Sequence, residues 1–175
     1  AARAIGYVTL TLLSGKSFIS NPLANGGNRV SDMLPSVPSG STLTKFNLVT
    51  SKWETNTFTD AWSQPGMTLA PGEGAVLDNK GDAFSVLLAG FTPWQKTTLS
   101  IPVGDSVVSP ALAKGGLLSS RLGLPLVEGL VVKLLNNGTG NYEAYTVLNG
   151  AWSPAEPVVA LGALTMNAWP SATTG

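Results

Sequence analysis

Apolar and polar residues alternate along the first part of the chain. Every second residue from Val8 to Leu12 is apolar, with Thr9 and Thr11 between them. This period of two is typical of a strand with one buried face. No segment shows a sustained period of 3.6 residues, which an amphipathic helix would require. The pattern therefore predicts an all-β protein.

Turn signals divide the chain into short strands. Twenty glycines and twelve prolines are spread along it, as β-sandwiches and barrels require. Residues 41–58 predict a hairpin that folds near Ser51 and Lys52. A second hairpin is expected to turn at Asn137 and Gly138, because Asn-Gly is a strong two-residue turn signal.

One short helical turn is expected at residues 31–34, with Ser31 as its N-terminal cap and Pro35 as its stop. Its counterpart would be residues 119–122. The predicted fold class is therefore all-β, with two small sandwich or barrel units that each contain a short helical turn.

The chain contains two similar halves. The stretch "SGKSFISNPLANGG" at 14–27 shares seven residues with "VGDSVVSPALAKGG" at 103–116, each pair 89 positions apart. The tripeptide "AWS" at 61–63 returns 90 positions later. So many matches in one order indicate an internal duplication. The predicted units are residues 1–93 and 94–175.

The first half ends with an apolar run of strand length, "AFSVLLAGF" at 83–91. An offset of 90 places the counterpart of this run beyond Gly175. The second unit is therefore expected to lack a final strand, which would leave unpaired N–H and C=O groups beside an apolar groove.

Three arrangements fit this expectation. The second unit has fewer strands and packs against the first or shares a strand with it; a neighbouring chain adds its residues 4–13 to the groove; or the native chain is longer. Strand addition between copies is head-to-tail and does not close on itself, so it generates a filament. In that arrangement the donor residues would be Tyr7, Val8, Leu10 and Leu12, and the acceptor residues would be Val158, Leu164 and Met166.

Charge and composition narrow the classes of partner. Only 11% of the residues are charged, and ten basic side chains balance ten acidic ones. Nucleic acid is not expected as a partner, because its binding needs a clustered positive field. Membrane insertion is not expected either, since apolar runs are short and the run at 124–135 is interrupted by Glu128 and Lys133. The start "AARAIG" has no signal-peptide pattern, although its small residues would suit an end left by signal cleavage.

The sequence offers little for catalysis. Histidine and cysteine are absent, which removes the usual general base, the common nucleophile–base pairs, disulfides and thiolate metal sites. Glu54 and Glu143 are equivalent in the two halves and are interpreted as a hairpin surface pair. The loop 78–82 could hold calcium but lacks a closing Glu, which favours a plain turn. We expect no enzyme activity, no metal and no cofactor.

Five tryptophans suggest roles in packing or recognition. Trp62 and Trp152 recur within "AWS" and are expected to anchor the core of each unit. Trp53 and Tyr142 lie in the hairpins and are candidates for a platform that stacks on sugar rings. Residues 137–139 read equally as a turn and as an N-glycan acceptor.

The succession of an alternating strand, an "NPL" turn, a hairpin and "LAPGEGAVLDN" resembles a repeated β domain of secreted surface proteins of environmental bacteria. The resemblance covers most of the first half and looser parts of the second, which lacks the Asn-Pro and the "PGEG". It implies an extracellular setting and a structural or adhesive role. The predicted function is a filament or surface-layer subunit assembled by head-to-tail strand complementation; a monomeric carbohydrate-binding or adhesion module is the alternative, and a carboxylate hydrolase is a weaker third.

Overall fold

The computed structural model describes residues 4–92, 99–111, 115–136, 139, 141–159 and 165–169, with the backbone alone for 165–169. The described residues form thirteen strands and one helix of four residues, which confirms the predicted all-β class. The described part of the chain has no helix that is long and apolar enough to cross a membrane.

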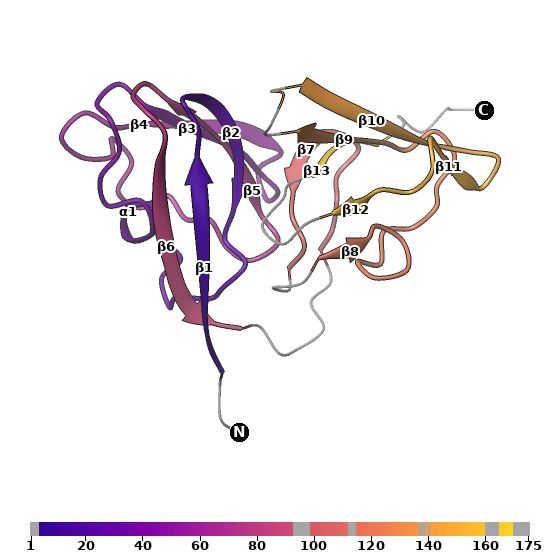
Figure 1. Cartoon of the computed structure of the whole chain (residues 1–175), viewed down its shortest axis with the longest axis horizontal. Helices are drawn as coiled ribbons and strands as arrows, with labels where there is room; N and C mark the ends of the chain where they lie inside the picture. Colours follow the sequence, from indigo (N-terminus) through magenta and orange to yellow (C-terminus); the bar gives the residue numbers. More distant parts are fainter. Residues whose placement is uncertain are drawn as a thin grey trace.

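A four-stranded antiparallel sheet forms the centre of the first unit, in the order β2-β5-β3-β4 (Figure 1). Its strands are β2 (Gly15–Ser20), β5 (Gly74–Asn79), β3 (Thr42–Asn47) and β4 (Lys52–Thr57). The β3–β4 hairpin turns at residues 48–51, where Ser51 has a positive φ of 53°. The predicted first hairpin is therefore confirmed.

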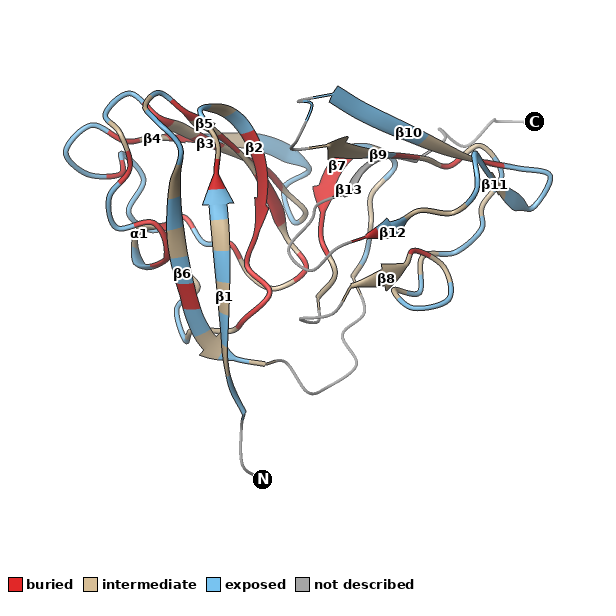
Figure 2. Cartoon of the chain, viewed as in Figure 1, coloured by how far each residue is buried: buried red, intermediate tan, exposed pale blue. Residues whose placement is uncertain are grey.

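A separate two-stranded antiparallel ribbon covers one face of this sheet. It pairs β1 (Ile5–Leu12) with β6 (Phe84–Phe91) along their whole length. More exposed and less exposed residues alternate along both strands (Figure 2). Leu12 and Leu88 from the ribbon are buried in one core with Leu43, Leu77 and other sheet residues.

Two opposed glycines let the ribbon approach the chain beneath it. Gly6 and Gly90 pair directly across the ribbon. A Cβ atom on Gly90 would lie 2.7 Å from the carbonyl oxygen of Ala24, and one on Gly6 would lie 2.8 Å from a methyl of Leu23. Ala24 and Phe91 exchange backbone hydrogen bonds at this point, so the close approach fixes one end of the ribbon.

The second unit is built on a five-stranded sheet in the order β11-β10-β9-β13-β7. Its strands are β11 (Ala151–Ser153), β10 (Asn141–Leu148), β9 (Val131–Asn136), β13 (Thr165–Trp169) and β7 (Gly104–Val108). A short pair, β8 (Gly116–Leu117) with β12 (Val158–Val159), lies below it.

The two sheets repeat each other strand by strand. The order β2-β5-β3-β4 corresponds to β7-β13-β9-β10, and paired residues in one sheet correspond to paired residues in the other at separations of 89 or 90 positions. The equivalent pairs include Gly15–Asn79 with Gly104–Trp169, Lys45–Ala75 with Leu134–Thr165, and Asn47–Lys52 with Asn136–Asn141. An internal duplication would produce this arrangement.

The helical turns differ between the units. The helix α1 spans Val30–Met33, and its N-cap is Arg29 without a side-chain capping bond, so the prediction of Ser31 as the cap is wrong. Residues 119–122 form hydrogen-bonded turns rather than a helix. There the carboxylate of Glu156 accepts hydrogen bonds from the backbone N–H and the hydroxyl of Ser119. Backbone hydrogen bonds from Arg121 to Leu117 and from Gly123 to Ser119 close these turns, and the predicted second helical turn does not form a helix.

The units meet through the outer faces of their sheets. Phe18 and Val107 occupy equivalent positions and are both buried in one small cluster, against which Val76 and Leu135 pack. Ser109 donates its backbone N–H to the carbonyl oxygen of Gly72. The contact therefore relates equivalent surfaces of the two sheets.

Candidate functional site

In the first unit, the inner face of the sheet is fully covered. The ribbon contributes Leu12 and Leu88 to the core, and Leu10, Phe84 and Val86 pack against it. As predicted, Trp62 lies in this core, and it is 5% exposed. In the first unit, the β1–β6 ribbon is thus the element that covers the inner face of the sheet.

The equivalent face of the second sheet has a smaller core, formed by Leu118, Leu130, Val132, Val147 and Val159. No residue that the structure describes places a ribbon over it. We call the part of this face that carries Ser106, Leu134 and Trp152 the open face, because no described ribbon lies over it; Ser106 is fully buried, and Leu134 and Trp152 are partly buried.

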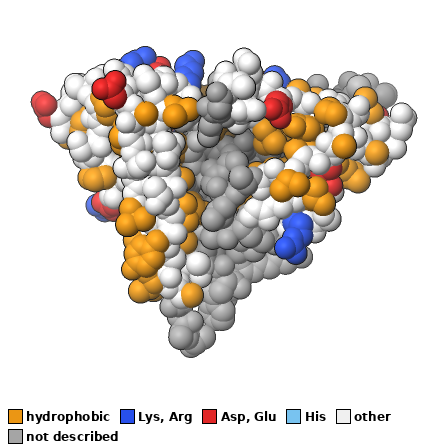
Figure 3. Space-filling model, viewed as in Figure 1, with side chains coloured by type: hydrophobic (Ala, Val, Ile, Leu, Met, Phe, Trp, Pro, Cys, Tyr) orange, Lys and Arg blue, Asp and Glu red, His pale blue; other side chains and the backbone are white. Residues whose placement is uncertain are grey.

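Three pairs of equivalent residues show the difference in cover. Trp62, Leu34 and Lys45 are buried in the first unit, whereas their counterparts Trp152, Leu122 and Leu134 are only partly buried. Leu99, the counterpart of Leu10, contacts the Gly72 loop of the first unit instead. Hydrophobic side chains are visible on this side of the second unit around β8 and β12 (Figure 3).

Two buried polar atoms of the open face find no hydrogen-bond partner among the described residues: Ser106 Oγ and Trp152 Nε1. Their counterparts in the first unit are both satisfied. Ser17 Oγ accepts a hydrogen bond from the Leu13 N–H at 3.3 Å, and Trp62 Nε1 donates to the Leu34 carbonyl at 2.7 Å.

The sequence explains the unsatisfied serine. The residue equivalent to Leu13 is Pro102, and proline has no backbone N–H to donate. A buried polar group without a partner costs about 1–3 kcal/mol. The open face therefore combines partly buried apolar side chains with two polar atoms that are buried beneath it without a hydrogen-bond partner.

The predicted donor residues divide between the two faces of β1. Leu12 is buried, and Val8 and Leu10 are partly buried on the side that faces their own unit, whereas Tyr7 is 67% exposed on the other side. In this structure β1 pairs with β6 of the same chain.

The predicted acceptor residues are only partly described. Val158 is 73% exposed and pairs with Leu117 in the β8–β12 pair. The backbone of Met166 pairs with Val107 and Lys133 in the middle of the sheet. Leu164 lies outside the described residues, as does the predicted turn at Asn137 and Gly138.

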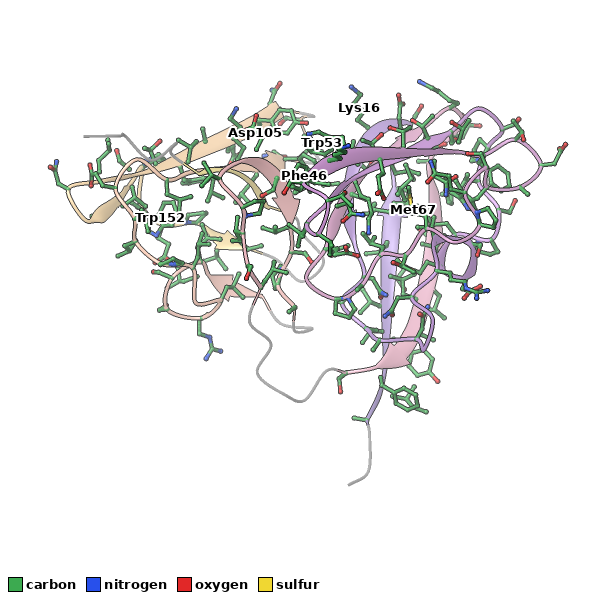
Figure 4. The ribbon with its side chains drawn as sticks, turned by 180° about the vertical axis from the view of Figure 1, so that it is seen from behind. Lys16, Phe46, Trp53, Met67, Asp105 and Trp152 are labelled. Carbon is green, nitrogen blue, oxygen red and sulfur yellow. The ribbon has the colours of Figure 1, made fainter. Side chains whose placement is uncertain are left out.

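The candidate sugar platform lies at the junction between the units. Tyr142 is 49% exposed and packs edge-on against Phe18 of the first unit, with ring centroids 5.6 Å apart. Trp53 packs edge-on against Phe46, on the side of the first unit that faces the second (Figure 4). Both rings thus have packing roles, and sugar binding stays a prediction.

The equivalent carboxylates occupy matching hairpin positions. Asn47 Nδ2 donates to Glu54 at 2.7 Å, and Asn136 Nδ2 donates to Glu143 at 3.0 Å. The hydrogen bonds from Asn136 and the Tyr145 hydroxyl lower the pKa of Glu143 below its usual value.

The described residues contain no group of three or more acidic side chains that could hold a metal ion. The loop 78–82 is organised by Asn79, whose amide donates to the carbonyl oxygens of Leu13 and Asp82. Asp78 forms an ion pair with Lys80. The local geometry is that of a turn between strands.

Sequence reasoning missed two features. The first is an ion pair in the first unit, where the ammonium of Lys45, a buried residue, contacts Glu73 at 2.9 Å and the Thr68 carbonyl at 2.8 Å. The second is the apolar outer surface of the ribbon, which includes Leu87 and Phe91. Only the second had a sequence signal, the unbroken apolar run at 83–91.

Among the described residues, a ribbon covers the inner face of the first sheet and none covers that of the second. Comparison of the chain with protein-family models, curated proteins and solved structures finds no match.

Proposed function

We propose that this protein is a non-enzymatic structural subunit that assembles head-to-tail into a filament or surface layer outside the cell. In this assembly a β segment of one copy covers the open face of the next. The observation that carries the proposal is the contrast between the ribbon-covered sheet of the first unit and the open face of the second.

The chemistry of the open face favours a β segment as its occupant. Covering Leu134 and Trp152 would stabilise the assembly by about 25 cal/mol for each Å² of apolar surface removed from water. Ser106 Oγ and Trp152 Nε1 are already buried within the chain, so the added segment would act by covering apolar side chains.

The geometry and charge of the chain support a filament. The ribbon belongs to the first unit and the open face to the second, so a contact between them joins different surfaces and builds an open filament when the rotation between copies does not close a ring. The formal net charge is zero, and repulsion between copies is correspondingly weak. The extracellular setting rests on the resemblance of the sequence to secreted surface domains.

Transfer of β1 alone to a neighbouring copy would cover one sheet but uncover another. The strand pairs with β6 over eight residues and buries Leu12 in its own core. If β1 left for a neighbour, the first unit would lose the cover that the second unit gained. The assembly therefore favours a donor segment that stays attached to its own unit.

Negative-stain electron microscopy and sedimentation velocity on the full chain test this proposal. We expect filaments or a concentration-dependent series of multimers. Deletion of residues 1–12 should abolish them, because it removes β1 and leaves β6 without a partner. Single particles of one chain at all concentrations would overturn the proposal.

A further inference from the structure

The loop that leads into β5 is bound to the core of the first unit by one buried lysine. We call residues 68–73 the docking loop. The ammonium of Lys45 in β3 donates to the Thr68 carbonyl at 2.8 Å and to Glu73 Oε1 at 2.9 Å. The other carboxylate oxygen of Glu73 accepts the N–H of Ala70 at 2.8 Å. Lys45 thus holds both ends of the docking loop, and Glu73 closes it internally.

The backbone of the same loop contacts the second unit. Ser109 donates its N–H to the Gly72 carbonyl at 3.0 Å and its hydroxyl to the Glu73 carbonyl at 3.2 Å. Glu73 also forms a β-bridge with Val108, the last residue of β7. Glu73 therefore contacts the first unit through its side chain and the second unit through its backbone.

The second unit packs closely around Gly72, which has a positive φ of 99°. This backbone conformation favours glycine. A Cβ atom there would lie 3.4 Å from the side chains of both Leu99 and Ala111, so the two segments that flank β7 leave little space beside the loop. Because these contacts are made to the loop backbone, they depend on the conformation in which the loop is held.

The second half of the sequence lacks both members of the ion pair. The residues 89 and 90 positions after Lys45 and Glu73 are Leu134 and Ala163. Leu134 occupies the inner sheet position that corresponds to Lys45, and the second sheet repeats the strand order of the first with a leucine there. A sheet of this type therefore forms without the two charges, and the ion pair has another role in the first unit.

We infer that the Lys45–Glu73 ion pair positions the second unit, because it holds the docking loop in the shape that binds the end of β7. A buried ion pair adds little net stability, since the desolvation of both charges offsets their attraction. It does select one geometry, because any movement that separates the charges leaves each of them buried without a partner.

This inference goes beyond the proposed function, because it concerns two units of one chain and holds whether or not copies assemble. In a head-to-tail assembly the same ion pair would also fix the direction from the ribbon to the open face within every copy. A fixed direction favours a regular filament over irregular aggregates.

Hydrogen exchange of the Ser109 amide, followed by NMR in dilute solution, tests the inference. The double variant Lys45→Leu with Glu73→Ala carries the two residues that the second half has at these positions. Exchange at Ser109 should become about tenfold faster, because its acceptor on the docking loop is no longer held and local opening is easier. The amides of Leu43 and Leu77, two fully buried residues in inner strands of the first sheet, should change little.

The matched control removes the exposed ion pair between Asp78 and Lys80 of the same unit. Asp78→Asn with Lys80→Gln also deletes one charge of each sign, and it should leave exchange at Ser109 unchanged. Unchanged exchange at Ser109 in the Lys45→Leu, Glu73→Ala variant would overturn the inference. Equal acceleration at Ser109, Leu43 and Leu77 would also overturn it, because the ion pair would then only stabilise the first unit.

Glu73→Gln is a second variant in case the double variant does not fold. Its side chain keeps the size of glutamate and still accepts from Lys45, but it loses the charge and one of the two acceptor oxygens. Faster exchange at Ser109 with unchanged exchange at Leu43 is expected, and wild-type exchange at Ser109 would overturn the inference. Neither result depends on assembly, so the proposed function is tested separately.

Discussion

Ser17 and Ser106 occupy equivalent places in two similar sheets but differ in their hydrogen bonding. Both are buried, yet the hydroxyl of Ser17 accepts a hydrogen bond from Leu13 while that of Ser106 has no described partner. The difference arises outside the sheet, where Pro102 replaces the donor. A single residue in a connecting segment thus determines whether a buried hydroxyl is stabilising.

We predict that alanine substitution has opposite effects at these two positions. Ser17→Ala should lower the free energy of unfolding by about 1 kcal/mol, because the Leu13 N–H loses its acceptor. Ser106→Ala should raise it by a similar amount, since it removes an unsatisfied polar group. Urea unfolding in dilute solution, where the chain is monomeric, measures both. Equal destabilisation by the two substitutions would show that Ser106 has a partner.

The buried ion pair between Lys45 and Glu73 could not be predicted from the sequence, for a different reason. Lys45 lies on an inner sheet position whose counterpart is Leu134, whereas its charge alone would assign the side chain to solvent. Its ammonium reaches a carboxylate 28 positions away along the chain. Buried charges are tolerated only when they are paired, and a partner so distant cannot be identified from local pattern.

At the scale of the element, the ribbon depends on its glycine pair. We predict that Gly90→Ala lowers the free energy of unfolding by about 2 kcal/mol, because the new methyl group would meet the Ala24 carbonyl and Leu23 in a place that cannot widen without moving backbone. Thermal or urea unfolding measures the change. Gly66→Ala is the matched control, since no atom lies within 4 Å of its added methyl group; equal losses in the two variants would contradict the packing role of Gly90.

The first strand and the first hairpin could be predicted from the sequence, whereas the start of the helix and the form of the turn at 119–122 could not. The alternation at Val8–Leu12 correctly predicts β1 and its inner face, and the turn near Ser51 is where the pattern places it. The cap of α1 was misplaced because Ser31 has the preferred chemistry, yet the helix begins two residues earlier, after Arg29. At residues 119–122, the carboxylate of Glu156, which is distant in sequence, accepts hydrogen bonds from Ser119, and local propensity does not reveal this contact.

At the scale of the molecule, the repeat in the sequence predicted two related units but not how they pack. The spacing of 89 or 90 residues recurs in the strand registers. The sequence predicted a groove beside an unpaired edge in the second unit. The described residues instead form a sheet face with no ribbon over it, and Ser106 Oγ and Trp152 Nε1 are buried there without a hydrogen-bond partner. The acceptor residues could not be chosen well from sequence, because alternation does not say which of two apolar faces a neighbouring unit covers.

The contacts at the junction between the units bear on whether the chain unfolds as one cooperative unit. Phe18 is buried among Val107, Val76 and Leu135 and contacts the ring of Tyr142, so the packing of each sheet depends on the other.

We predict a single cooperative unfolding transition for the wild-type chain in dilute solution. Phe18→Ala should cost about 3 kcal/mol through the cavity it leaves, and it should split the transition in two, because the remaining link at Ser109 and Gly72 is mainly a backbone contact. Differential scanning calorimetry measures this, with the exposed Val49→Ala as a control that should leave the transition unchanged. Two transitions in the wild-type chain would show that the units fold independently and that the junction contributes little to their stability.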